Sequence, residues 1–214
     1  MGTSTVLAAA SKLFHGRARV FVAAVTLTGW GVVAFGLGGW QSKDVTFFCI
    51  YLYLALLATG LRSRRTFHAE AVPVQFLFVL AALKELSLSE VLLLAAASSL
   101  LEALSNSRIR FLTPDVWFHG AVMTLAASSA WLVHAHLMVN WPVVAAPLAL
   151  MLAASVYFAT STLLISQATA LRDRLSIKTI WQDVHLCSYP YYLVGATMAS
   201  LLRITDRSIN WTIC

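Results

Sequence analysis

The residues of this chain that could do chemistry are polar side chains set inside long apolar runs. Glu90 lies one turn into the apolar run 86–104, and Glu85 lies just before it. A polar group left unpaired in an apolar membrane interior costs several kcal/mol, so each one marks a candidate site. Glu90 and its neighbours could line a cavity for a ligand or an ion. Alternatively, both glutamates lie at the outer membrane interface, where they are solvated or cap the helix, with Ser87 or Ser89 as the capping residue.

Histidines supply the second kind of candidate. His119, His134 and His136 fall in the apolar run 116–137. His134 and His136 are two residues apart and therefore point to different sides of a helix, and His119 is about four turns away. This spacing does not predict a metal site. For an intramembrane enzyme, the side chains of Glu90, His119 and His134 would have to line one water-filled cavity.

An aromatic run around a proline is the third candidate. Tyr189, Pro190, Tyr191 and Tyr192 follow one another within the apolar run 184–202. A proline inside a helix removes one backbone hydrogen bond and bends the helix, so Pro190 is the predicted hinge. The phenols could reach a ligand, or they could anchor the helix at the membrane interface.

The elements that must position these residues are transmembrane helices. Of the 214 residues, 59% are hydrophobic and 11% are charged, whereas soluble domains carry about 25% charged residues. So few charges could not cover a soluble surface, but a bilayer requires an apolar exterior. The sequence predicts an all-α polytopic bundle with seven transmembrane segments: about 20–38, 45–61, 71–83, 86–104, 116–137, 142–170 and 184–202. The third is short for a crossing and could form a re-entrant hairpin with the fourth.

Charge asymmetry predicts the orientation. With the N-terminus in the cytoplasm, the inner loops hold 11 of the 15 Lys and Arg residues and the outer loops hold 4, as the positive-inside rule requires. The expected organisation is a cytoplasmic N-terminal segment at 1–19, a transmembrane domain at 20–203 and a short tail at 204–214. The basic residues lie in short loops rather than in a patch, so nucleic-acid binding is not expected.

Motifs of soluble enzymes are missing from the sequence. It contains no glycine-rich nucleotide loop, no GxSxG and no HExxH, and no pair of carboxylates forms a convincing catalytic arrangement. The three cysteines have neither metal-ligand nor disulfide-framework spacing. No enzymatic activity and no cofactor are therefore expected.

Three stretches resemble one family of bacterial membrane proteins. They are the run FLFVLAALKELSLSE ending at Glu90, the run SYPYYLVGA over 188–196, and Tyr51–Leu61 with the preceding Trp40. Together they resemble the N-terminal multi-pass sensor regions of cyclic-di-GMP signalling proteins, whose outputs are GGDEF cyclases or HD-type phosphodiesterases. The basic stretch 62–68 departs from the family pattern, which is more apolar there, and the chain ends where the family continues into a further helix and an output domain.

The resemblance implies an input module of the inner (plasma) membrane without catalytic activity. The expected partners are the bilayer, an unidentified small ligand, a cytoplasmic signalling output and a second copy of the chain. A ligand entering near Glu85 and Glu90 would shift the helix that contains Pro190. The alternative is a small-molecule-binding transporter component resembling the S-components of energy-coupling-factor transporters. The expected ligand-contacting residues are Glu85, Glu90, Gln75, His119, Tyr189, Tyr191 and Tyr192.

Overall fold

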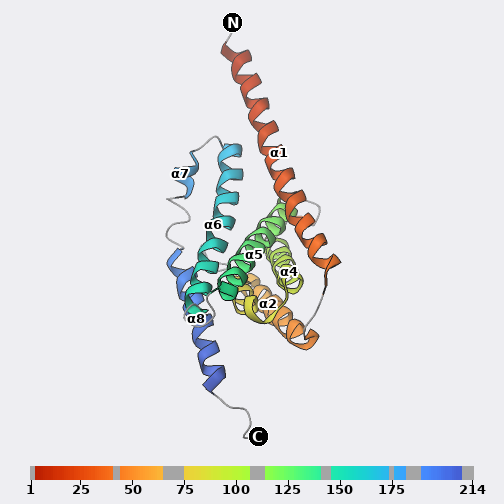
Figure 1. The fold of residues 1–214 in the computed structure, drawn as a ribbon. Helices are drawn as coiled ribbons and strands as arrows, with labels where there is room; N and C mark the ends of the chain where they lie inside the picture. Colours follow the sequence, from red (N-terminus) through yellow and green to blue (C-terminus); the bar gives the residue numbers. More distant parts are fainter. Residues whose placement is uncertain are drawn as a thin grey trace.

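The computed structural model describes residues 3–40, 44–64, 75–106, 114–140, 146–173, 176–181 and 189–208. All regular structure in these ranges is helical, as the sequence predicted (Figure 1). The elements in chain order are α1 (Thr3–Gly38), α2 (Val45–Arg64), α3 (Gln75–Glu85), α4 (Leu88–Asn106), α5 (Pro114–Asn140), α6 (Ala146–Asp173), the short α7 (Ile177–Ile180) and α8 (Tyr189–Ser208).

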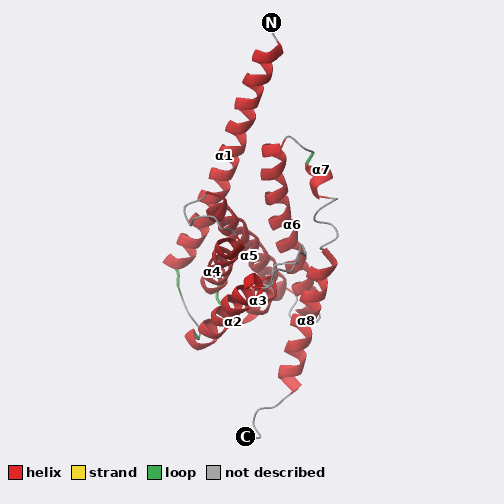
Figure 2. Ribbon diagram, turned by 180° about the vertical axis from the view of Figure 1, so that it is seen from behind, coloured by secondary structure: helices red, strands yellow, loops and turns green. Residues whose placement is uncertain are grey.

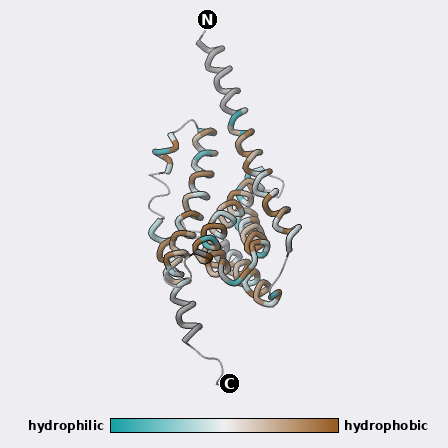
Figure 3. The backbone as a smooth tube through the Cα atoms, viewed as in Figure 1, coloured by the Kyte–Doolittle hydropathy of each residue, from teal (hydrophilic) through white to brown (hydrophobic). Residues whose placement is uncertain are grey.

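Three of the helices are long and apolar enough to cross a membrane. They are the Gly16–Gly38 part of α1, the Pro114–Val139 part of α5 and the Pro147–Asp173 part of α6, and the apolar part of α2, Val45–Leu61, is shorter. The tube coloured by hydropathy in Figure 3 is brown along much of these segments. Large apolar side chains also lie exposed on the outside of the helices, including Leu27 on α1. The chain is therefore a helical membrane protein.

The helix boundaries differ from the predicted segments at several points. α1 begins at Thr3, so the predicted N-terminal segment 1–19 is helical from that residue and continues directly into the apolar part. α3 has 11 residues and therefore a length of about 16 Å, roughly half the hydrocarbon thickness of a bilayer. Of the predicted segment 71–83, residues 71–74 lie outside the described ranges. Two residues, Leu86 and Ser87, separate α3 from α4.

Prolines stand in the first turns of three helices. Pro114 is the first residue of α5, and Pro147 and Pro190 are the second residues of α6 and α8. Proline suits the first turn because the backbone N–H that it lacks has no helical partner there. The predicted hinge at Pro190 inside a helix over 184–202 stays a prediction, because α8 is described from Tyr189 and residues 182–188 lie outside the described ranges.

α4 lies at the centre of the packing, in contact with α1, α2, α3 and α5. α6 packs on α5 and α1 along one side and on α8 along the other, and seen from behind, α8 runs beside the lower part of α6 (Figure 2). Small residues let the helices approach closely. A Cβ placed on Gly29 of α1 would lie 2.6 Å from the backbone oxygen of Ala121 in α5, so the two backbones are in contact there.

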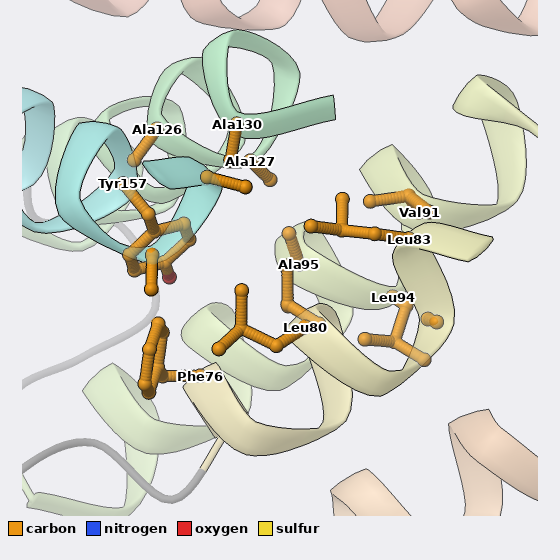
Figure 4. Packing of buried hydrophobic residues seen from close by; sticks show 14 of the residues in the cluster. Phe76, Leu80, Leu83, Val91, Leu94, Ala95, Ala126, Ala127, Ala130 and Tyr157 are labelled. Carbon is orange, nitrogen blue, oxygen red and sulfur yellow. The ribbon is translucent and has the colours of Figure 1, made fainter. Parts of the chain in front are cut away.

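The buried core joins α3, α4, α5 and α6. Leu80 of α3 faces Ala95 of α4 in Figure 4, and Phe76 of α3 lies next to Tyr157 of α6. The alanines of α5 at 126, 127 and 130 are fully buried. Van der Waals contact of this kind drives helix association in lipid, where no hydrophobic effect separates a helix from its surroundings.

Candidate functional site

Six aromatic side chains connect α8 to the rest of the bundle, and we refer to them as the aromatic cluster. They are Phe76 of α3, Tyr157 and Phe158 of α6, Trp181 directly after α7, and Tyr189 and Tyr192 of α8. The sequence placed the tyrosines of α8 among the candidate residues, but the other four members were missed: Phe76, Tyr157, Phe158 and Trp181. Aromatic residues are common in this chain, and no periodicity distinguishes these four.

The ring contacts run continuously from α3 to α8. The ring centroids of Phe76 and Tyr192 are 4.3 Å apart, and those of Phe76 and Tyr157 are 5.3 Å apart. Phe158 lies 4.9 Å from Tyr192 and 5.2 Å from Tyr189. Tilted and edge-on pairs at these distances contribute about 0.5–1.5 kcal/mol each beyond their buried area.

Three hydrogen bonds fix the polar ends of these rings. The hydroxyl oxygens of Tyr189 and Ser155 are 3.0 Å apart. Ser155 already donates to the backbone oxygen of Met151 at 2.8 Å, so Tyr189 is the donor in this pair. Trp181 Nε1 donates to Thr162 Oγ1 at 3.1 Å. The hydroxyl of Tyr157 donates to the sulfur of Met123 at 3.4 Å.

Gly195 allows α8 to lie close to α3. A Cβ at this position would lie 2.7 Å from Cδ2 of Leu77 and 3.0 Å from Cε1 of Phe76. A larger residue would therefore push α8 away from α3, and Tyr192 would move away from Phe76 with it. The glycine belongs to the run SYPYYLVGA that carried the family resemblance, but no role was predicted for it.

Gln75, one of the predicted ligand-contacting residues, is the most unusual polar group in this region. It is the first residue of α3, it directly precedes Phe76, and its side chain is 1% exposed. Neither its amide nitrogen nor its amide oxygen has a hydrogen-bond partner among the described residues. A buried amide without a partner costs about 1–3 kcal/mol. This amide is therefore the group best placed to gain from a new polar partner.

Glu90 has a well-defined structural role at the start of α4. Its Oε2 accepts the backbone N–H of Ser87 at 2.8 Å and the hydroxyl of Ser87 at 2.9 Å. A glutamate three residues after the capping residue that accepts this N–H forms half of a capping box. The capping alternative predicted this geometry, although Glu90 is fully buried rather than solvated.

The structure separates the other predicted residues from this region. Glu85, at the end of α3, is exposed. Tyr191 is 65% exposed and points away from the packed side of α8, on which Tyr192 is buried. His119 is half-buried in α5 and is not part of the aromatic cluster.

The histidines of α5 do not come together. His119 and His134 lie on one continuous helix, 15 residues or about 22 Å apart along its axis. They therefore cannot line one small catalytic cavity with Glu90. Within the described ranges, no three His, Cys, Asp or Glu side chains are grouped so that they could hold a metal ion.

No protein-family model, no curated protein and no solved structure matches this chain. The site therefore has to be interpreted from its own geometry. That geometry is a buried amide without a hydrogen-bond partner among the described residues, next in the chain to an aromatic contact between α3 and α8.

Proposed function

We propose that this protein is a membrane signal-input module in which α8 carries the signal. The observation that carries the proposal is Gln75, because its buried amide has no described partner and its neighbour Phe76 packs on Tyr192 of α8. The polar group that would respond to the signal, Gln75, is therefore next in the chain to Phe76, which would transmit the response to α8.

The buried amide of Gln75, without a partner among the described residues, has an energetic cost. Its cost of about 1–3 kcal/mol raises the free energy of the packing described here relative to any packing in which the amide finds a partner. Two states separated by a few kcal/mol exchange populations when a ligand or an altered bilayer favours one of them. A small hydrogen-bonding molecule that reaches Gln75 therefore shifts the population.

The route to α8 is short. Movement of Phe76 alters its contact with Tyr192, and Gly195 leaves no spare room between α8 and Phe76 or Leu77. Packed interfaces tend to switch between discrete arrangements rather than deform continuously. A change at the start of α3 is thus passed on as a displacement of α8.

The proposed topology is the one that the charges predict. The N-terminus lies in the cytoplasm, α3 and α4 cross as a hairpin with a turn at Leu86 and Ser87, and seven crossings result. The proposed output is a cytoplasmic signalling domain or protein of the cyclic-di-GMP class, in line with the family resemblance. Catalytic activity belongs to that output in this proposal.

A distance measurement between spin labels tests the proposal. Met198 on α8 and Tyr53 on α2 are both exposed, and cysteines at these two positions, with the native cysteines replaced by serine, accept the labels. The protein is reconstituted in nanodiscs and exposed to a panel of amino acids, sugars, nucleosides and quinones, and to bilayers of different thickness. We expect at least one condition to shift the distance distribution.

Gln75→Leu provides the decisive comparison. It removes the unpaired amide, so we expect it to increase thermal stability and to abolish the shift. Gln167→Leu in α6 is the matched control, because Gln167 is only half-buried and should leave the response unchanged. A distribution that is the same in every condition, and the same in Gln75→Leu, would falsify the proposal.

A further inference from the structure

A groove lies between α1, α5 and α6, the three helices that are long and apolar enough to span a membrane within their described residues. It is lined by residues of α1, α5 and α6, and its volume is about 1030 Å³. The helices that form it also contact one another directly, so the groove follows the line along which they meet. It lies apart from the aromatic cluster, and none of the cluster's residues lines it.

The charged residues of the groove come from matching ends of these helices. Arg19 lies near the start of the apolar part of α1, Asp115 at the start of α5 and Arg172 near the end of α6. These ends therefore lie at the same face of the membrane. Both arginines are exposed, and the groove carries two positive charges and one negative charge.

The remainder of the groove is apolar. Val22, Phe118, Ile165 and Ala168 contribute to its walls. Thr26 also lines it, but its hydroxyl donates to the backbone oxygen of Val22 at 2.7 Å. From Ala18 to Leu27 the lining of α1 extends over nine residue steps, which is about 14 Å or close to half of the hydrocarbon core.

We infer that this groove is a binding site for an anionic phospholipid. The phosphate would lie between Arg19 and Arg172, and an acyl chain would lie along the apolar walls. Arginine binds phosphate oxygens in a bidentate fashion, and basic pockets between transmembrane helices at one membrane face bind anionic headgroups. The net positive charge of the rim selects an anionic lipid over a zwitterionic one.

Native mass spectrometry of the full chain tests this inference. The protein is purified from nanodiscs that hold equal amounts of phosphatidylglycerol and phosphatidylcholine, and the lipid that it retains is counted. We expect phosphatidylglycerol to be retained preferentially. Arg19→Gln with Arg172→Gln should reduce this preference about 25-fold, since each basic residue near the membrane surface contributes about a factor of five.

Two further variants serve as matched controls: one should leave the lipid preference unchanged, and the other should strengthen it. Arg17 is exposed on α1 two residues before Arg19, but it does not line the groove, so Arg17→Gln should retain the preference. Asp115→Asn removes the opposing charge and should strengthen it. Equal losses in Arg17→Gln and in the double variant would overturn the inference, because general surface charge would then explain the binding.

Two further measurements identify the occupant. Ala168→Phe fills the groove and should reduce retention of both lipids, whereas the arginine pair affects only the preference. Inorganic phosphate should not displace the lipid, because it lacks the acyl chain. Displacement by phosphate, or a dimer that retains no lipid, would overturn the inference.

Salt titration of the unmodified protein keeps the test valid if a variant fails to fold. The preference for phosphatidylglycerol must fall as salt screens the exposed arginines. A preference that does not depend on salt contradicts the inference.

Discussion

Most buried hydroxyl groups of this bundle are satisfied within their own helix. Ser98, Thr124 and Ser161 each donate to a backbone oxygen three or four residues earlier in the chain. This arrangement makes a small polar residue tolerable in an apolar interior. Gln75 differs because it is the first described residue of α3 and neither atom of its side-chain amide has a hydrogen-bond partner among the described residues. Its amide, unlike these hydroxyl groups, can therefore gain a hydrogen bond from a ligand.

The pair formed by Tyr189 and Ser155 gives a prediction at the residue scale. Tyr189→Phe removes the hydroxyl that donates to Ser155, so we expect a loss of about 0.5–1.5 kcal/mol of unfolding free energy. Tyr191→Phe, two residues away on the exposed side of α8, should have no measurable effect. Thermal unfolding in detergent provides the comparison.

A double-mutant cycle checks that the loss belongs to this bond. Ser155→Ala combined with Tyr189→Phe should be less destabilising than the sum of the two single variants, because both remove one interaction. Full additivity would show that the two hydroxyls do not interact.

At the scale of the elements, glycines decide which helix pairs are in contact. Gly29 lies against the backbone of Ala121, whereas a Cβ at Gly31, two residues further along α1, would have no neighbour within 4 Å. Both glycines occupy the same helix and face opposite surroundings. Helix propensity is therefore the same for both, and only the packing differs.

Alanine at these two positions gives opposite expected results. Gly29→Ala forces α1 away from α5, and we expect it to lower the free energy of unfolding by about 1–3 kcal/mol, as overpacking does. Gly31→Ala should be neutral or should stabilise by up to about 1 kcal/mol through helix propensity. Unfolding of both variants side by side in the same detergent measures the difference. Similar effects at the two positions would contradict the close contact between α1 and α5.

At the scale of the whole molecule, the groove relates the directions of the spanning helices. The starts of the apolar parts of α1 and α5 and the end of α6 line it together. α6 therefore runs opposite to α1 and α5 across the membrane. Sequential segments that alternate in direction give the same relation, and the proposed topology places this face in the cytoplasm.

Reporter fusions test the proposed topology. Fusions after Gly60, Ser107 and Arg174 should report the cytoplasm, and a fusion after Cys214 should report the outside. A cysteine at Glu85, in a background without native cysteines, should react with an impermeant maleimide from the outside if α3 and α4 both cross. Protection of this cysteine would show that α3 and α4 form a re-entrant hairpin, and the count of crossings would fall to five.

Much of the helical architecture could be predicted from the sequence. Apolar runs predicted the spans in α1, α5 and α6, because a bilayer demands about 20 apolar residues whatever the rest of the chain does. The short run before Glu85 was recognised as the weakest crossing, and α3 has only 11 residues. A helical start at residue 184 stays a prediction, because α8 is described from Tyr189 and residues 182–188 lie outside the described ranges.

The sequence by itself determined that this protein is a bundle of membrane helices, because composition and segment length depend on the solvent and not on which helices pack together. Only the tertiary structure decided which polar residues matter. Gln75 and Glu90 looked alike as polar residues beside apolar runs, yet Glu90 is satisfied by Ser87 and Gln75 has no described partner. Contacts between Phe76 and Tyr192, and the groove that brings Arg19 to the same face as Arg172, join residues more than 100 positions apart. Such proximities follow from the packing of whole helices, which local patterns in a sequence do not encode.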